Sequence, residues 1–196
     1  MDADFDAAVL GLAMPAGVEA ALREAGARRG DAATTMAALM RAQALAPDHP
    51  AVLIAFYRHH FYGHRLDLAR NVARRALVVA ARALGLPAVW REAPRQPLPG
   101  ARHDARTRFF LFLLKGYAYL SLRLGDGSEA RDALALLREV DPQDCVGASM
   151  LEAVRQRAEA APTHDGDNDD LDIAACAQVT GASAWASLAR APGALR

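Results

Sequence analysis

The sequence predicts an all-α fold: a short right-handed α-solenoid of helical hairpins with a C-terminal capping helix. Three observations predict it: a repeat of 34 residues, apolar residues at helical spacing within each repeat, and shared loop residues. Gly30 and Gly125 mark the turns of the first and third repeats, and Pro47 and Pro142 close them. A period of this length is typical of hairpins that bury their apolar faces only by stacking on one another.

Each repeat is expected to contain two helices, because its apolar residues recur every three or four positions. The expected helices cover residues 17–28, 32–45, 50–63, 66–84, 108–124, 128–140 and 144–160. Pro50 suits the first turn of its helix, and Ser128 is expected to act as an N-cap. In the second repeat, His64 occupies the position where a loop glycine is expected.

The predicted organisation is a helical array over residues 1–160, an acidic linker over 161–172 and a tail over 173–196. Pro47 and Pro142 are 95 residues apart, where two intact repeats would give 68. The 27 extra residues correspond to an insertion at 85–108, whose four prolines predict a long, semi-extended segment. Such loops are either functional or mobile, and the alternative is a tolerated insertion without a role. In the tail, residues 173–188 are expected to form a short helix that docks back onto the array.

Composition favours a cytoplasmic protein without a membrane partner. The formal net charge is zero, so the whole molecule has no general attraction to nucleic acid or membrane surfaces. The acidic first six residues are unlike the basic start of an export signal. The most apolar stretch, 109–124, carries two cations and is shorter than the roughly 20 residues that span a bilayer. Cys145 and Cys176 are expected to be free and reduced.

Residues of characteristic size recur at equivalent positions of the three repeats. They are Leu22, Gly30, Leu39, Ala42 and Pro47; Leu53, Phe56, Tyr57, His60, Ala69, Ala73 and Ala76; and Leu114, Tyr117, Ala118, Ala130, Leu134 and Pro142. In these positions residues 16–160 resemble tetratricopeptide repeats. Tyr57 departs from the family pattern, which has a small residue there, and Ala81 stands where a proline is expected. The whole sequence also resembles small repeat proteins encoded near bacterial nitrogen-fixation genes.

The resemblance implies a concave groove lined by the first helix of each hairpin, and a non-catalytic adaptor that binds a protein or peptide there. The groove residues that we expect to bind the partner are Arg28, Arg58, Phe61, Tyr62, Lys115, Tyr119 and Arg123. Arginine binds carboxylates bidentately, and cations beside aromatic faces suit an acidic partner. The alternative is that these are ordinary solvated arginines and half-buried aromatic residues.

Other interpretations remain open from the sequence. The protein could be a chaperone or maturation accessory for a bacterial metalloenzyme complex linked to nitrogen fixation. It could form a homodimer or bind RNA through arginine, although no nucleic-acid-binding module is recognisable. Residues 58–108 hold eleven arginines against three acids, whereas 159–172 hold six acids and no base. The acidic segment could therefore fold over the basic one, or could serve only as a solubilising tail.

The sequence favours no enzyme chemistry, cofactor or metal. His60 and His64 are four residues apart, but no glutamate follows the first of them as in a zinc protease helix. Asp165, Asp167 and Asp169 alternate as in a calcium loop, but the glycine and the closing glutamate of such a loop are missing. Neither a glycine-rich phosphate loop nor a nucleophile elbow is present. We therefore expect no catalytic residues.

Overall fold

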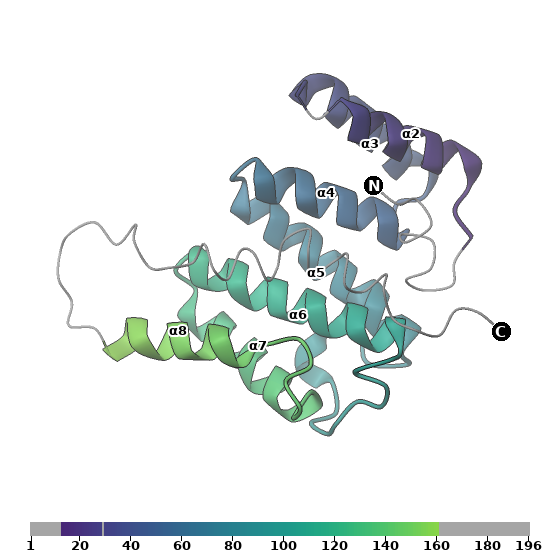
Figure 1. Ribbon diagram of the computed structural model, residues 1–196. Coiled ribbons are helices and arrows are strands. Elements are labelled where there is room, and N and C mark those ends of the chain that lie inside the picture. The colour runs from purple at the N-terminus through teal and green to yellow at the C-terminus, as the bar shows by residue number, and fades with distance from the viewer. Residues whose placement is uncertain (1–12, 29, 161–196) are drawn as a thin grey trace. The chain divides into compact units, whose positions relative to one another are not determined.

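The structure of the chain, a computed structural model, describes residues 13–28 and 30–160 (Figure 1). Within that part every regular element is a helix, so the all-α class is confirmed. The chain divides into two compact units, of which the first ends at Trp90 and the second begins at Arg91. The expected linker (161–172) and tail (173–196) lie outside the described residues.

The first unit begins with a hairpin of α2 (Ala16–Ala27) and α3 (Ala32–Leu45). Asp31 caps α3, because its carboxylate accepts hydrogen bonds from the Ala33 and Thr34 N–H groups, both at 3.1 Å. Val18, Leu22 and Leu39 form the core of the hairpin. Both helices start and end within one residue of the predicted ranges, 17–28 and 32–45.

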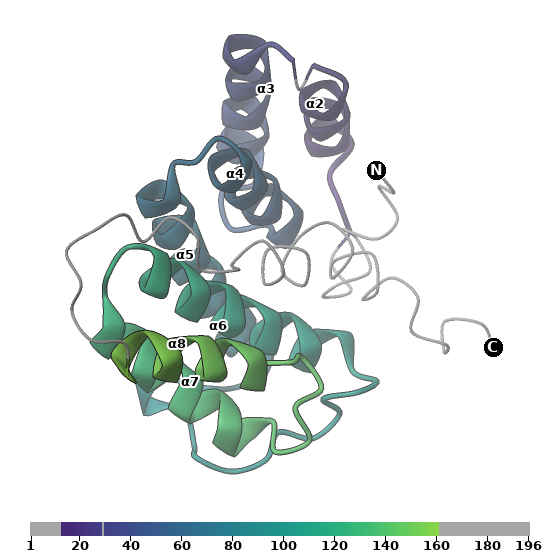
Figure 2. The same ribbon diagram turned by 60° about the vertical axis from the view of Figure 1, so that its left-hand side comes forward.

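A second hairpin, of α4 (Pro50–Tyr62) and α5 (Leu66–Ala83), completes the first unit, and α4 also contacts α2 and α3 (Figure 2). The buried side of α5 consists mostly of small residues, which let a neighbouring helix approach closely: Ala69, Ala73, Ala76, Ala80 and Ala81. His64, in the turn between them, has a φ of 54°. This turn has the left-handed backbone that glycine adopts freely, although the residue at this position is a histidine.

The second unit contains a hairpin of α6 (Ala105–Arg123) and α7 (Gly127–Val140). Its core is aromatic and aliphatic, and includes Phe109, Phe110, Leu114, Tyr117, Leu134 and Leu137. The cap predicted for the second helix is wrong by two residues. Asp126 accepts from the Glu129 N–H and is the N-cap, whereas Ser128 lies inside the helix and its hydroxyl contacts Asp126.

The last described helix, α8 (Ser149–Ala160), begins five residues later than predicted. Asp144 and Gly147 both have positive φ values, 51° and 66°, so the chain from 144 cannot start as a right-handed helix. The Asp144 carboxylate instead accepts from the Ser149 N–H and hydroxyl at the start of α8. Helix α8 packs on α7.

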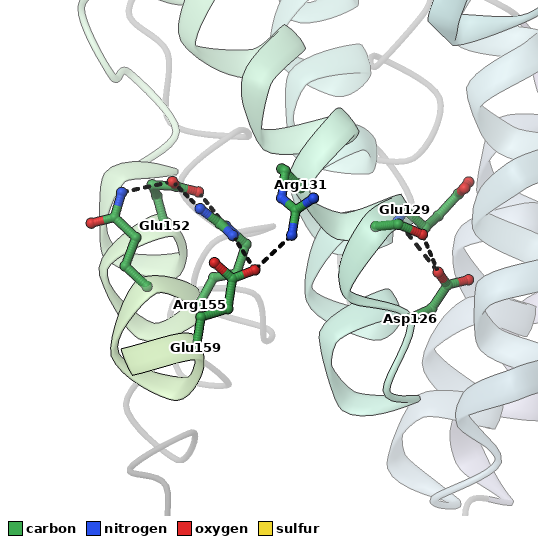
Figure 3. Close-up of polar contacts among 8 residues, drawn as sticks. Asp126, Glu129, Arg131, Glu152, Arg155 and Glu159 are labelled. Carbon is green, nitrogen blue, oxygen red and sulfur yellow. Dashed lines mark hydrogen bonds and ion pairs between the residues drawn. The ribbon is translucent and has the colours of Figure 1, made fainter. Parts of the chain in front are cut away.

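An ion-pair network ties α8 to α7. Arg155 is 8% exposed and pairs with Glu152 at 2.7 Å and Glu159 at 2.6 Å. Figure 3 shows Arg131 reaching Glu159 from α7, a contact of 2.8 Å. Glu159 pairs with Arg155 on its own helix and with Arg131 on α7, so the network links α8 to α7.

From Arg91 onward the predicted insertion belongs to the second unit. It contains a short 3-10 helix (Trp90–Glu92), and Trp90 and Ala93 are buried. The Leu98 N–H donates to the Val140 carbonyl at 2.9 Å, so the segment runs beside the end of α7. It also ends earlier than predicted, because Asp104 caps α6 by accepting from Thr107 N–H at 2.8 Å.

Candidate partner-binding face

Helix α4 brings together three of the seven residues that the sequence analysis assigns to partner binding. Arg58, Phe61 and Tyr62 are related by three and four positions, so they are neighbours on one side of the last two turns. We call these three residues the α4 face. Arg58 and Phe61 are half-buried, and Tyr62 is 56% exposed.

Ring contacts hold the aromatic residues of the α4 face in place. Phe61 stacks on Tyr57 with ring centroids 5.7 Å apart and meets Tyr62 edge-on at 5.5 Å. Tyr57 is itself buried, so the bulky residue that departs from the repeat pattern anchors this stack. A rigid aromatic surface beside an arginine costs little entropy when a partner binds.

Arg28 lies on the other hairpin of the first unit, at the end of α2. Its side chain is exposed, and its carbonyl accepts from the Asp31 N–H and the Thr35 hydroxyl, at 2.8 and 2.6 Å. The Arg28 backbone is therefore part of the turn that positions α3. Its expected contact with a partner stays a prediction.

The other three residues belong to the second unit, and two of them are buried. Lys115 and Tyr119 are each 2% exposed, whereas Arg123 is exposed and donates to the Tyr119 hydroxyl at 3.1 Å. The Lys115 ammonium donates to the Val146 carbonyl at 2.6 Å. The sequence analysis expects Lys115 on an open groove, but here it supports the loop between α7 and α8. Partner binding by these residues remains untested.

A second polar cluster, which the sequence analysis missed, joins the insertion to the α6–α7 hairpin. The Tyr117 hydroxyl donates to Glu129, and the Arg91 guanidinium pairs with the same carboxylate. Arg91 also lies 3.6 Å from Asp132. These residues come from three separate segments, so no local spacing in the sequence could have indicated the cluster.

The surroundings of the histidines next to the α4 face favour the neutral imidazole and lower its pKa. His60 is 8% exposed, and the ring of His59 contacts the Arg65 guanidinium. Burial lowers the pKa of both imidazoles, and the charge of Arg65 lowers them further. Among residues 13–28 and 30–160, no group of three or more His, Cys, Asp or Glu side chains is placed to hold a metal ion.

We expect the stability of the first unit to fall as the pH drops below about 6.5. Burial also lowers the pKa of His49, so three imidazoles bind protons more readily in the unfolded chain than in the folded one. Their contribution is complete above about 6.5, the ordinary pKa of histidine, and is lost as the pH falls through the lowered values. Urea unfolding at pH 7.5 and pH 5.5, at constant ionic strength, measures the loss. The His60→Gln variant should lose less stability over this interval than the wild type, and an identical slope would contradict the assignment.

Cys145 is a free, half-buried thiol in the loop before α8, and Cys176 lies outside the described residues. Burial raises the pKa of the Cys145 thiol, as does the nearby Asp141 carboxylate, while Arg102 acts in the opposite direction. A thiol with a raised pKa is a poor nucleophile at neutral pH. These surroundings favour a structural role for Cys145 over a role as a reactive thiol.

Similarity to known proteins adds a genomic context. In the part of the chain that the structure describes, no helix has the length and apolar character needed to cross a membrane. The chain is 38% identical over 150 residues to an uncharacterized 19.8 kDa protein in the nifW 5′ region of Azotobacter chroococcum mcd 1. The match covers 76% of this chain and 84% of that protein. No family model and no solved structure matches the chain.

Proposed function

We propose that this protein, which belongs to the same family as the uncharacterized 19.8 kDa protein in the nifW 5′ region, is a non-catalytic adaptor. Its helical hairpins would stack as tetratricopeptide-like repeats and bind an acidic protein or peptide. The observation that carries the proposal is the α4 face, where the half-buried Arg58 lies beside the exposed ring of Tyr62. Three consecutive helix pairs, with small residues on the buried side of α5, support the repeat architecture.

The charge of the first unit agrees with an acidic partner. Residues 13–90 contain ten arginines and five carboxylates, a formal net charge of +5, and the three aspartates of residues 1–12 lower the net charge of the whole unit to +2. Three of the carboxylates already pair with arginines within the unit: Glu19 with Arg23, Glu24 with Arg41 and Asp48 with Arg75. The surplus of positive charge would speed up encounters with an acidic surface, while the aromatic rings would supply apolar contact.

The test uses the full chain and an array of short peptides whose net charge ranges from strongly negative to strongly positive. We expect acidic peptides that contain an aromatic residue to bind the wild type. The Arg58→Glu variant should bind them about 10- to 100-fold more weakly, because a charge-assisted hydrogen bond contributes about 1.5–3 kcal/mol. Tyr62→Ala should weaken binding without changing its dependence on salt.

Arg157→Glu is the matched control, because Arg157 is exposed on α8 and the substitution changes the net charge by the same amount. Its affinity for the peptides should stay close to that of the wild type. Equal losses in Arg58→Glu and Arg157→Glu would mean that only overall charge matters and would remove the α4 face as a site. Binding of RNA, with a steep dependence on salt and no preference among peptides, would favour an arginine-mediated RNA contact instead.

A second candidate function is supported by the relative's location. We propose that the partner is a component of a metalloenzyme complex linked to nitrogen fixation, for which the protein would act as a chaperone or maturation accessory. The similar Azotobacter chroococcum protein lies in the nifW 5′ region. Deletion of the gene should then lower the yield of active enzyme under nitrogen-fixing conditions only, and an unchanged yield would exclude the accessory role.

A further inference from the structure

A second cation lies next to the α4 face, on the turn between α4 and α5. The Arg65 guanidinium folds back onto the last turn of α4, where Nη2 lies 2.5 Å from Nε2 of His59. A β-carbon added to Gly63 would be 3.5 Å from both Nε and Nη2 of Arg65, so the guanidinium lies directly over this glycine. Arg65 is exposed to solvent. The turn therefore holds a positive charge at a defined place on the surface of α4.

Arg58 and Arg65 flank the exposed ring of Tyr62. Arg58 precedes Tyr62 by four positions, and His59, which contacts Arg65, precedes it by three. Residues at both spacings are neighbours on a helix, and they lie on opposite sides of the later residue. An anionic group beside the Tyr62 ring would therefore be within reach of both guanidinium groups. The α4 face thus continues past Tyr62 onto Arg65.

No carboxylate among the described residues of the first unit offsets these two cations. Three of the five carboxylates pair with other arginines, and Asp31 caps α3. Asp67, in the first turn of α5, forms no ion pair with Arg58 or Arg65. In addition, Nε of the half-buried Arg58 has no hydrogen-bond partner in the described part of the chain. Neighbouring cations without counter-charges repel each other, and a bound anion would relieve this repulsion.

The two arginines supply the charge of this surface at neutral pH. Burial, and then the charge of Arg65, lowers the pKa of His59 and of His60, while Asp67 acts on His60 in the opposite direction. A neutral His59 can accept a hydrogen bond from Arg65 without adding to the charge. The last turn of α4 therefore presents two positive charges, one on each side of an aromatic ring.

We propose that Arg58 and Arg65 together bind a dianionic group of the partner, namely a phosphorylated side chain beside an apolar residue that packs on Tyr62. A phosphate monoester carries about two negative charges at neutral pH and three acceptor oxygens, so it matches two guanidinium groups better than one carboxylate does. The inference rests on the proposed adaptor function, because it uses the α4 face. It adds Arg65 as a binding residue and His59 as the residue that positions it.

The test measures the affinity of the full chain for three versions of one acidic peptide. The peptide contains a tryptophan and a nearby serine, which is unmodified, phosphorylated or replaced by glutamate. We expect the wild type to bind the phosphorylated version about 10- to 100-fold more tightly than the unmodified one, because both guanidinium groups gain charge-assisted hydrogen bonds. The glutamate version, which adds a single charge, should gain less.

Three variants assign the preference for phosphate to the proposed residues. Arg65→Gln should remove most of it and leave the affinity for the unmodified peptide nearly unchanged. His59→Ala should reduce it as well, although the net charge near pH 7.5 stays the same. Arg82→Gln is the matched control, because Arg82 is exposed near the other end of α5, about 25 Å from Arg65 along the helix. It should keep the preference of the wild type.

The possible failures are distinguishable. Equal affinity of the wild type for the phosphorylated and unmodified peptides would overturn the inference, while weaker binding of acidic peptides by Arg58→Glu would still support the adaptor function. Equal losses in Arg65→Gln and Arg82→Gln would assign the preference to overall charge and would also overturn it. Inorganic phosphate that binds as tightly as the phosphorylated peptide would mean that a free anion occupies the site, against the proposal. Failure of every peptide to bind would overturn both proposals.

Discussion

Replacing Lys115 with alanine is expected to lower the free energy of unfolding of the second unit by about 3 kcal/mol, the largest effect that we predict. Lys115 is 2% exposed within α6, and its ammonium donates to the Val146 carbonyl at 2.6 Å. The substitution removes a long buried side chain, which leaves a cavity, and takes the donor from a carbonyl in the loop between α7 and α8. Urea unfolding of the full chain, followed by circular dichroism, measures the loss.

The Lys115→Met variant separates the two causes. Methionine fills most of the volume but cannot donate a hydrogen bond, and it also removes the cost of burying a charge. We expect it to lose about 1 kcal/mol, mainly from the unpaired Val146 carbonyl. If methionine is as harmful as alanine, packing of the aliphatic chain is unimportant, and if alanine is harmless, the lysine does not support the loop.

Replacing Glu129 with alanine is expected to destabilise the second unit by about 2 kcal/mol and to loosen the segment between α5 and α6. The carboxylate, whose side chain is only 18% exposed, accepts from the fully buried Tyr117 and pairs with Arg91. Without it the buried hydroxyl loses this acceptor and Arg91 loses its close ion pair on α7, while its contact with Asp132 at 3.6 Å remains. Hydrogen exchange of the Leu98 amide, which bonds to Val140, should become faster together with the loss of stability.

Tyr117→Phe is the matched variant for this cluster. It removes only the hydroxyl and leaves the pair of Arg91 with Glu129, so we expect a loss of about 1 kcal/mol. The Leu98 amide should then keep its protection from exchange. Faster exchange in Tyr117→Phe would mean that the hydroxyl, and not Arg91, holds the segment against α7.

Local signals in the sequence were sufficient for most helix boundaries. The helix predicted over 32–45 is found at Ala32–Leu45, because Asp31 supplies the cap that ends the preceding turn. Pro50 opens α4 in the same way, and the left-handed residues His64 and Gly125 end α4 and α6 at the expected turns. Caps, prolines and glycines act on their immediate neighbours, so they can be recognised without knowledge of tertiary contacts.

The resemblance to tetratricopeptide repeats predicted the part of the candidate site that lies within one helix. Arg58, Phe61 and Tyr62 share a side of α4 because residues three and four positions apart are neighbours on any helix. The same resemblance placed Lys115 on an open groove, but Lys115 is buried. Its hydrogen-bond acceptor, the Val146 carbonyl, lies 31 residues further along the chain, after the whole of α7.

By itself, the sequence determined the helical class, the hairpin turns and the grouping of the α4 face, since all three depend on residues close together in the chain. The tertiary structure alone decided which polar residues are buried and what they contact. Asp144 and Gly147 adopt left-handed conformations that delay α8 to Ser149, and the loop they form receives Lys115. The insertion similarly finds its place through Arg91 and Leu98, whose partners lie on α7. Such contacts depend on how helices pack, and no periodicity within a single helix encodes them.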